Sequence, residues 1–214
     1  KLIDKLRKYL QLDINYLISN NKKFIKVPCP ACQNKKNKKY ITKNNFKYLI
    51  CEKCYTFFLS PRPSKKLLEE FYKQSTVYKF FNDYIFPQTE KNRSKKIVLP
   101  RIKKIIELSK KYNLKKPSIM EVGAGFGTFC HLANKSKHFS SVMAVEPSPG
   151  GAANCKKKNI DTYQGAIENL NINKKFDLIV NFEVIEHLFS PKIFLIFMKK
   201  FLKKKGFITL TCPN

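Results

Sequence analysis

The chain has 214 residues, of which 43% are hydrophobic and 13% aromatic, so it can bury a core and is not a disordered segment. It has no run of about 18 apolar residues and no N-terminal signal pattern, which argues against a transmembrane helix or a secreted protein and predicts a cytoplasmic location. Lysine and arginine number 43 against 15 acidic residues, which gives a formal net charge of +28.

This charge has two interpretations. A polyanionic partner such as nucleic acid, an anionic membrane surface or a phosphorylated substrate would explain it, and so would a genome that favours lysine and asparagine codons. Phosphate and base recognition favours the planar arginine fork, yet only four of the basic residues are arginine: Arg7, Arg62, Arg93 and Arg101. The composition therefore favours codon bias. Residues 1–116 carry 30 basic and 8 acidic residues, whereas residues 117–214 carry 13 and 7.

The first 116 residues divide into three predicted segments. Apolar residues at helical spacing predict an amphipathic helix over 1–18, within a lead-in that ends at residue 26. Residues 27–60 contain four cysteines and short β-like runs at 46–50 and 55–59. Residues 61–116 are predicted to be a helical and aromatic connector. In it, Ser64 caps a helix that ends near residue 75, residues 76–100 are irregular, and residues 101–113 form a second helix.

The four cysteines form two pairs of the type Cys-x-x-Cys, with 18 residues between the pairs. Each pair can aim two thiolates at one point, and two such turns complete a tetrahedron around a metal ion. The ligands would be Cys29, Cys32, Cys51 and Cys54. This set favours a structural Zn²⁺, because four protein ligands leave no open position. Iron in a rubredoxin-like site and a module without metal are the alternatives.

From residue 117 the pattern alternates between strands and helices. Strands are predicted at 118–122, 141–146, 160–164, 176–182 and 207–212, and helices at 126–135, 148–158 and 191–203. Strands that alternate with helices predict the α/β class, with a Rossmann-like parallel sheet and helices on both of its faces.

A glycine-rich loop joins the first strand of this half to its helix, in the sequence Glu121-Val-Gly123-Ala-Gly125-Phe-Gly127. Such a loop lets a ligand approach the backbone at the start of a helix. The dinucleotide spacing fails because Thr128 stands where its last glycine would be. The acid before the loop suits a ligand with a positive amine. Glu146, at the end of the next strand, can accept hydrogen bonds from both hydroxyls of a ribose.

Three motifs together resemble the class I S-adenosylmethionine-dependent methyltransferases. They are the glycine loop, V-E-P-S-P at 145–149, and F-D-L-I-V-N-F-E-V-I-E-H-L at 176–188 followed by Pro191, which is similar to the form found in ubiquinone-type O-methyltransferases. The resemblance implies S-adenosylmethionine as the cofactor. The cofactor-binding residues that it implies, with Glu121 near the ammonium and Glu146 at the ribose, are Glu121, Gly123, Gly125, Gly127, Glu146, Pro147, Ser148, Ala166, Ile167 and Phe182. Relatives often carry an acid where this chain has Ala166, so the adenine contact is expected from the backbone of Ala166 or Ile167.

The front half resembles the zinc-binding N-terminal region of bacterial methyltransferases of surface-glycan and sugar modification. The resemblance rests on the cysteine pairs, on F-F-L-S-P-R-P at 57–63 and on L-L-E-E-F-Y at 67–72. The sheet of the methyltransferase family normally has seven strands. We therefore expect this domain, residues 117–214, to be incomplete after its fifth strand.

These features give three hypotheses about function. The leading one is a methyltransferase for a small molecule such as a nucleotide-linked sugar or a surface-glycan precursor, with His187 as the catalytic base. His187 could instead cap the helix that begins at Pro191. The second hypothesis is a ribosomal RNA methyltransferase that binds RNA through a zinc ribbon and a basic face. The third is a non-catalytic zinc-ribbon interaction protein.

Overall fold

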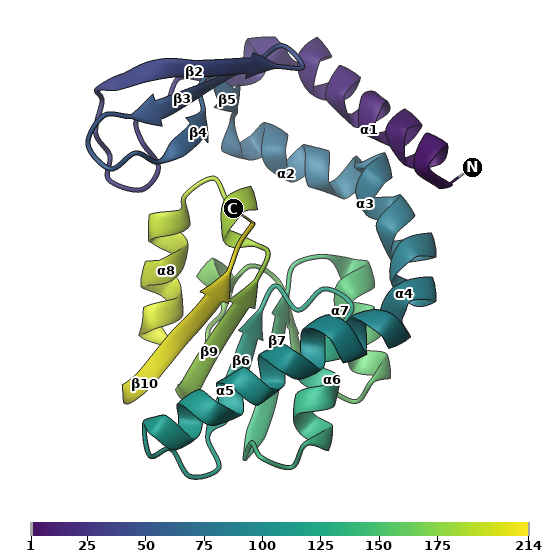
Figure 1. Cartoon of the computed structure of the whole chain (residues 1–214), viewed down its shortest axis with the longest axis vertical. Coiled ribbons are helices and arrows are strands. Elements are labelled where there is room, and N and C mark those ends of the chain that lie inside the picture. The colour runs from purple at the N-terminus through teal and green to yellow at the C-terminus, as the bar shows by residue number, and fades with distance from the viewer. Residues whose placement is uncertain (1, 214) are drawn as a thin grey trace. The chain divides into compact units, whose positions relative to one another are not determined.

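The computed structural model describes residues 2–213, and the chain divides into two compact units (Figure 1). The first unit contains the residues up to Tyr84 together with Phe189–Lys192, and the second contains Ile85–Leu188 and the residues from Ile193 onward. This grouping is coarser than the four segments predicted from the sequence, whose boundaries stay predictions.

The first unit combines three helices with two small antiparallel sheets. The strands β2, β3 and β4 pair in that order, and β1 pairs with β5. The elements are α1 (Leu2–Ser19), β1 (Phe24–Ile25), β2 (Asn37–Lys43), β3 (Phe46–Cys51), β4 (Phe57–Leu59), β5 (Arg62–Pro63), α2 (Lys65–Gln74) and α3 (Thr76–Phe80). The sequence did not predict β2, because this lysine-rich edge strand exposes six of its seven residues and lacks an apolar alternation.

A buried aspartate attaches α1 to the start of α3. The Asp13 carboxylate accepts hydrogen bonds from Ser75 Oγ at 2.5 Å and from both the backbone amide and the hydroxyl of Thr76 at 2.9 Å. It thereby satisfies amide groups that the first turn of a helix leaves without intrahelical partners. These bonds explain how a charged side chain can be buried between two helices.

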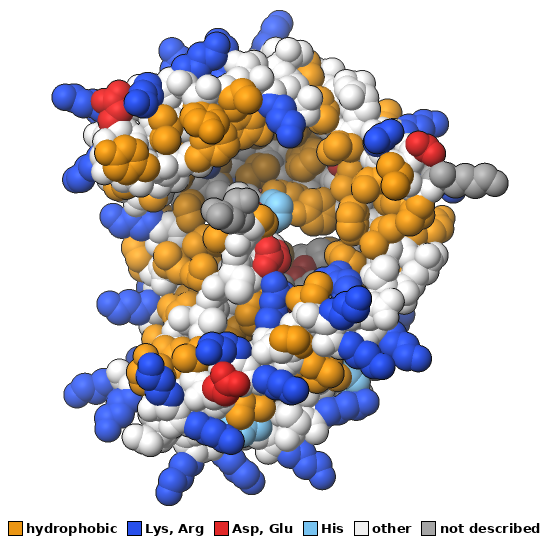
Figure 2. Space-filling model, in the orientation of Figure 1, with side chains coloured by type: hydrophobic (Ala, Val, Ile, Leu, Met, Phe, Trp, Pro, Cys, Tyr) orange, Lys and Arg blue, Asp and Glu red, His pale blue; other side chains and the backbone are white. Residues whose placement is uncertain are grey.

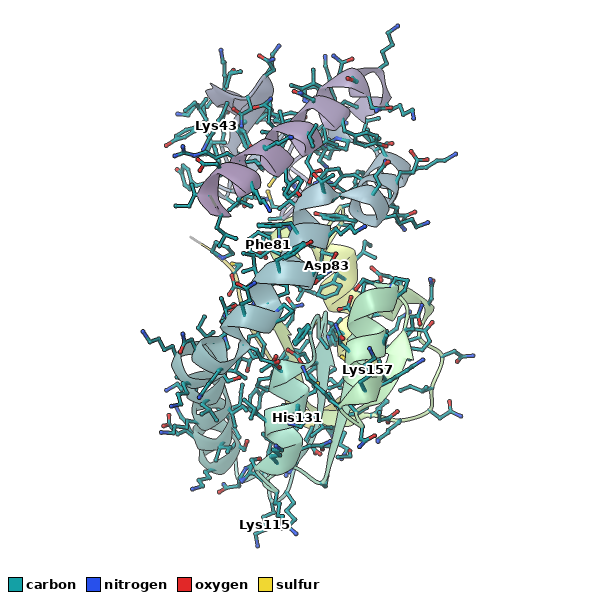
Figure 3. The ribbon with its side chains drawn as sticks, turned by 90° about the vertical axis from the view of Figure 1, so that its right-hand side faces the viewer. Lys43, Phe81, Asp83, Lys115, His131 and Lys157 are labelled. Atoms are coloured by element: carbon teal, nitrogen blue, oxygen red, sulfur yellow. The ribbon has the colours of Figure 1, made fainter. Side chains whose placement is uncertain are left out.

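The stretch 76–100, expected to be irregular, is helical, so this prediction was wrong. After α3, a π-helical turn at Phe81–Ile85 leads into α4 (Phe86–Arg93), and a second one at Ser94–Val98 leads into α5 (Leu99–Lys111). Phe81 and Asp83 are labelled on the first of these turns in Figure 3. Pro87 and Pro100 lie in the first turns of α4 and α5, where proline is tolerated.

The second unit contains a five-stranded sheet in the order β10-β9-β6-β7-β8, and every neighbouring pair is parallel. This confirms the predicted α/β class. The elements are β6 (Ser118–Val122), α6 (Thr128–Lys135), β7 (Ser141–Glu146), α7 (Pro149–Lys157), β8 (Asp161–Gln164), β9 (Phe176–Phe182), α8 (Pro191–Lys200) and β10 (Leu202–Thr211). The last helix ends earlier than predicted, because the chain enters β10 at Leu202 and shifts register before Phe207.

Helices cover both faces of this sheet, as predicted. On one face, side chains of α5 and α6 such as Ile105 and Phe129 pack against Ile119 of β6. On the other face, Phe194 and Met198 of α8 pack against Met120, the next residue of the same strand. Since neighbouring residues of a strand point to opposite faces, the fully buried β6 supplies both cores.

Among the charged side chains on the visible surface, basic ones clearly outnumber acidic ones (Figure 2). None of the helices within residues 2–213 combines the length and apolar character that crossing a membrane requires.

Candidate functional site

The glycine loop follows β6 and adopts the left-handed conformation at all three glycines. The φ angles are +81° at Gly123, +53° at Gly125 and +73° at Gly127. A Cβ atom at Gly123 would lie 2.6 Å from Val184, and one at Gly127 would lie 2.8 Å from the Cys155 sulfur, so close packing requires glycine there. A Cβ at Gly125 would meet nothing within 4 Å. The middle glycine therefore faces open space that a ligand can enter.

Glu146, at the end of β7, fastens this loop. Its Oε2 accepts a hydrogen bond from the Gly125 amide at 2.8 Å, and its Oε1 accepts from the amide and the hydroxyl of Ser148 at 2.8 and 2.6 Å. Ser148 also caps α7, and its neighbour Pro147 is exposed. The structure thus brings Gly125, Glu146 and Ser148 together. A carboxylate offers about four lone pairs, and three of them are already used.

The loop after β8 joins the same group of residues. The Gly165 amide donates to the Glu146 carbonyl at 3.1 Å, and Ala166 and Ile167 follow directly. The Ile167 side chain is buried in the core beside α8, so only its backbone can contact a ligand.

Glu121, at the penultimate position of β6, is 4% exposed and accepts a hydrogen bond from the Cys130 thiol at 3.0 Å. Burial raises the pKa of Glu121 to about 8; the Cys130 hydrogen bond opposes this rise and the nearby Glu146 charge adds to it. The carboxyl group is therefore mostly neutral at pH 7. The sequence predicted its position at the glycine loop and could not predict this protonation state.

Arg101 lies at the end of β9, and the sequence analysis missed it. Arg101 of α5 lies 4.6 Å from the Phe182 ring centroid and donates to Glu183 Oε1 at 2.7 Å. The Thr211 hydroxyl donates to the same oxygen at 2.7 Å. Arg101 is far from Phe182 in sequence, and no motif of the chain connects the two residues.

Asn181 is the second residue that was missed. It is fully buried, its amide nitrogen donates to the Val122 carbonyl at 2.8 Å, and its Oδ1 has no hydrogen-bond partner among residues 2–213. A buried polar atom without a partner indicates a place where water or a ligand binds. An asparagine within the apolar strand 176–182 was the signal that could have identified it.

His187 lies on a 3₁₀ turn, Ile185–His187, that follows β9. Its side chain is 47% exposed, and its Nε2 lies 3.7 Å from Glu186 Oε1. The turn places His187 four residues before Pro191, at which α8 begins.

The four cysteines of the first unit form one cluster. Their sulfur atoms all lie within 4.8 Å of one another, with Cys29 and Cys54 at 3.5 Å and Cys32 and Cys51 at 3.6 Å. Both Cys-x-x-Cys turns have the same geometry: the residue after each second cysteine is left-handed and donates its amide to the first cysteine's carbonyl, at 2.9 Å for Gln33 and 3.0 Å for Tyr55.

Two thiols of the cluster have a lowered pKa. Burial alone would raise the pKa of Cys51, but hydrogen bonds from the backbone amides of Cys54 and Lys53 and from Asn34 lower it to about 6. Hydrogen bonds to the Cys54 sulfur lower the pKa of that thiol as well. The pKa of Cys32 is lowered by the Asn34 amide but raised more strongly, to about 12, by the neighbouring thiols. Metal binding requires the thiol protons to leave, and a low pKa makes that loss easier.

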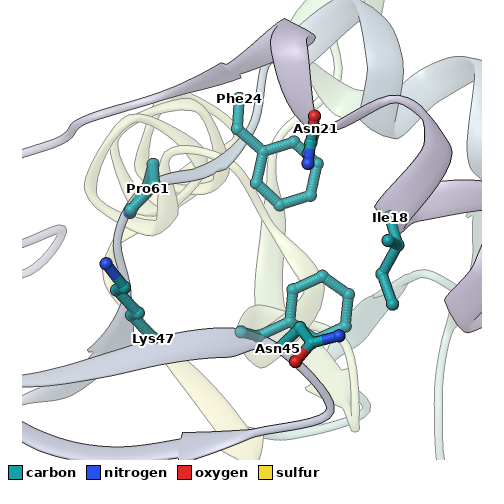
Figure 4. Close-up of a pocket in the computed structure, with 7 residues that line it drawn as sticks. Ile18, Asn21, Phe24, Asn45, Lys47 and Pro61 are labelled. Atoms are coloured by element: carbon teal, nitrogen blue, oxygen red, sulfur yellow. The ribbon is translucent and has the colours of Figure 1, made fainter.

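Two surface pockets, of about 260 and 530 Å³, are present in the first unit. Figure 4 shows the smaller one, with Ile18, Phe24, Asn45 and Lys47 among the residues around it. Neither pocket is lined by a residue predicted to bind the cofactor or to act in catalysis.

Comparison with protein families identifies the second half of the chain. A family model described as "Methyltransferase domain" matches residues 91–214, more than half of the chain. The chain belongs to this methyltransferase family. The match contains the glycine loop, Glu146 and the end of β9, which lie at the carboxyl ends of the parallel strands.

Individual relatives agree with this family. The chain is 30% identical over 121 residues to a ubiquinone biosynthesis O-methyltransferase of Rickettsia akari, covering 53% of this chain and 48% of that protein. It therefore spans about half the length of the curated relatives it matches. In fold it is similar to a S-adenosylmethionine-dependent methyltransferase from Clostridium acetobutylicum, with 21% identity, a TM-score of 0.51 and coverage of 61% and 56% of the two chains. It is also similar to a sugar N-methyltransferase from Streptoalloteichus, with 17% identity, a TM-score of 0.52 and coverage of 59% and 53%.

The protonation of Glu121 gives a test of this site. Its pKa in the folded protein lies above its ordinary value of 4.5, so its contribution to stability is fully present below pH 4.5 and is lost as the pH rises toward 8. Glu121→Gln removes this titration. Between about pH 5 and pH 8 the free energy of unfolding of the original protein should fall more steeply than that of the variant, by up to about 1.4 kcal/mol per pH unit. Urea unfolding of both proteins measures the two slopes, and parallel slopes would show that Glu121 is ionised in the folded state.

Proposed function

We propose that this protein transfers a methyl group from S-adenosylmethionine to a small-molecule acceptor, such as a nucleotide-linked sugar or a surface-glycan precursor. The observation that carries the proposal is the left-handed glycine loop, tied to Glu146 through the Gly125 amide in a chain of the methyltransferase family. Open sheets of this class bind ligands at the carboxyl ends of their strands, where this loop lies.

The residues present fit this cofactor in three respects. Gly125 has open space beside it, Asn181 Oδ1 has no hydrogen-bond partner within the described part of the chain, and the backbone of Ala166 and Ile167 starts a turn beside Glu146. We assign Gly123 and Gly127 to the shape of the loop and Phe182 to the wall beside it. The neutral carboxyl of Glu121 becomes ionised when an ammonium group lies nearby, since an opposite charge favours the charged form.

We propose that Glu146 accepts hydrogen bonds from the ribose hydroxyls. The hydrogen bonds that it already accepts limit how it can do so. Only about one of its lone pairs is free, so accepting two hydroxyl groups requires Ser148 Oγ to give up its bond to Oε1. The Gly125 and Ser148 amides can keep their bonds. In this way Glu146 would bind the ribose and hold the loop at the same time.

S-adenosylmethionine supplies an electrophilic methyl group on a sulfonium, and this chain aligns and deprotonates the nucleophile. His187 follows β9 and its side chain is half exposed, so an acceptor hydroxyl can reach it. As the acceptor oxygen forms its bond to the methyl carbon, the bond from sulfur to that carbon breaks and the hydroxyl proton passes to the imidazole. S-adenosylhomocysteine and the methylated acceptor are the products.

The relatives support a small acceptor without naming it. The curated relatives are ubiquinone biosynthesis O-methyltransferases, and solved structures of similar fold include a sugar N-methyltransferase. An RNA acceptor is the second candidate, because β2 exposes Lys38, Lys39 and Lys43 in the strongly basic first unit. A non-catalytic interaction protein is less well supported, since the glycine loop is left-handed at its glycines and bound to Glu146.

We also propose a cytoplasmic location for the enzyme.

We also propose that the cysteine cluster holds a structural Zn²⁺ through Cys29, Cys32, Cys51 and Cys54. Sulfurs at about 2.3 Å from a tetrahedral zinc lie about 3.8 Å apart, and the two closest pairs here lie at 3.5 and 3.6 Å. Four sulfur ligands leave no position for a substrate, so the metal would stabilise the fold of the first unit. Iron remains the alternative for the same ligands.

The proposed role of Glu146 predicts how strongly two variants bind the cofactor in comparison with the original protein. Glu146→Gln should weaken the binding of S-adenosylmethionine by roughly 1.5–3 kcal/mol, because a charged acceptor is lost. Ser148→Ala removes the hydroxyl that competes for Oε1, so it should change the affinity less than about threefold. Titration calorimetry measures both, and equal losses in the two variants would place the ribose elsewhere.

The acceptor assignment is tested with a panel of sugar nucleotides, glycan precursors and ribosomal RNA. Methyl transfer to a sugar nucleotide or glycan precursor is expected, and His187→Ala should lower kcat far more than it weakens cofactor binding. RNA should bind only at low salt. It should be released at about 150 mM salt, where exposed charges more than about 8 Å apart are largely screened from one another. Nanomolar binding of a ribosomal RNA hairpin, with methylation of one base in it, would instead establish the RNA candidate.

The metal proposal predicts about one zinc per chain in protein purified without chelators. Cys51→Ser should lose the metal and destabilise the first unit, whereas Cys212→Ser, which changes an exposed cysteine outside the cluster, should keep both. Elemental analysis and thermal unfolding measure these outcomes. Protein that contains iron, or no metal, would contradict the assignment.

A further inference from the structure

A lysine at the end of α7 contacts the glycine loop at its centre. Lys158 Nζ donates a hydrogen bond to the Phe126 carbonyl at 2.8 Å and lies 3.9 Å from the centroid of the Phe126 ring. Phe126 is the residue between Gly125 and Gly127. The lysine therefore contacts both the backbone and the side chain of Phe126.

Glu90 of α4 holds the lysine in turn. Glu90 Oε1 accepts from Lys158 Nζ at 2.8 Å and from the Thr128 hydroxyl at 3.1 Å. One carboxylate oxygen thus joins three parts of the second unit: α4, the first residue of α6 and the end of α7. The side chains of Lys158 and Glu90 are only 20% and 34% exposed, so water screens this pair less than a surface ion pair.

The loop needs such a restraint because of its composition. Glycine loses more conformational freedom on folding than any other residue, and three glycines in five positions leave the loop free to adopt many shapes. Glu146 fixes the Gly125 amide from one side. The Phe126–Gly127 peptide group, two peptide groups further along, is held at both of its polar atoms: the Gly127 amide donates to the Ala124 carbonyl at 2.9 Å, and the Phe126 carbonyl accepts from Lys158. Loss of the lysine would remove the hydrogen bond to this carbonyl and leave the peptide group held, within residues 2–213, only at its amide.

We propose that Glu90 and Lys158 are positioning residues that hold the glycine loop in its cofactor-binding conformation before the cofactor arrives. This proposal rests on the proposed function, since the ligand in question is S-adenosylmethionine. Glu90 lies just before the region that the family model matches, residues 91–214, so the restraint includes a residue outside the matched domain. Preorganisation of this kind raises affinity because less ordering entropy is lost on binding.

Titration calorimetry with S-adenosylhomocysteine, carried out on the full chain, tests the proposal. Lys158→Met and Glu90→Gln should each weaken binding by about tenfold, and the double variant should bind no more weakly than Lys158→Met, because the two residues act as a unit. Lys158→Arg should recover part of the loss. Lys157→Met is the matched control: Lys157 is the exposed neighbour on α7 labelled in Figure 3, and its loss should change affinity less than twofold.

Hydrogen exchange of the amides at residues 123–128, measured without ligand, separates this proposal from the proposed function. In Lys158→Met these amides should exchange faster while those of β6 and β9 keep their rates, which a general loss of stability would not produce. If the original protein does not bind S-adenosylhomocysteine, the proposed function fails. The exchange data alone then decide whether Glu90 and Lys158 restrain the loop. Unchanged loop exchange, or unchanged affinity in Lys158→Met, would overturn the proposal.

Discussion

The hydrogen bond from the Gly125 amide to Glu146 is the interaction on which the site depends. It joins the end of β7 to the loop after β6, and the same carboxylate orders the start of α7 through Ser148. Because parallel strands bring their carboxyl ends to one edge, a single buried acid can connect two crossover loops there. Tertiary contacts therefore help to set the loop conformation.

The two buried acids near this loop have different hydrogen-bond partners. Glu146 accepts three hydrogen bonds, from two backbone amides and a hydroxyl. Glu121 accepts only from a thiol and lies in the interior, so its pKa is raised to about 8. Two carboxylates of like charge close together would repel each other. The neutral state of Glu121 removes that repulsion until a cation is present to favour ionisation.

The sequence predicted the parts of this protein that local patterns encode. The glycine loop and the paired cysteines have short, fixed spacings, and the structure places each set together. The prediction of an irregular stretch at 76–100 was wrong: the stretch is helical, and Pro87 and Pro100 lie in first turns, where proline is compatible with a helix. Contacts between distant residues were not predictable: Arg101 on Phe182 and Glu90 on Lys158 follow from how α4 and α5 pack in the second unit.

The scarcity of acids explains why so many of them have more than one partner. With 15 acidic residues against 43 basic ones, most lysines cannot be paired and remain in water. Acids that contact more than one residue join separate elements: Asp13 at the start of α3, Glu90 between α6 and the end of α7, Glu146 at the glycine loop, Asp177 between β6 and β10, and Glu183 at the end of β9. Net repulsion among the lysines favours expansion of the chain. Each such acid therefore contributes a specific contact and also lowers this repulsion, so its loss should cost more than the loss of an exposed lysine.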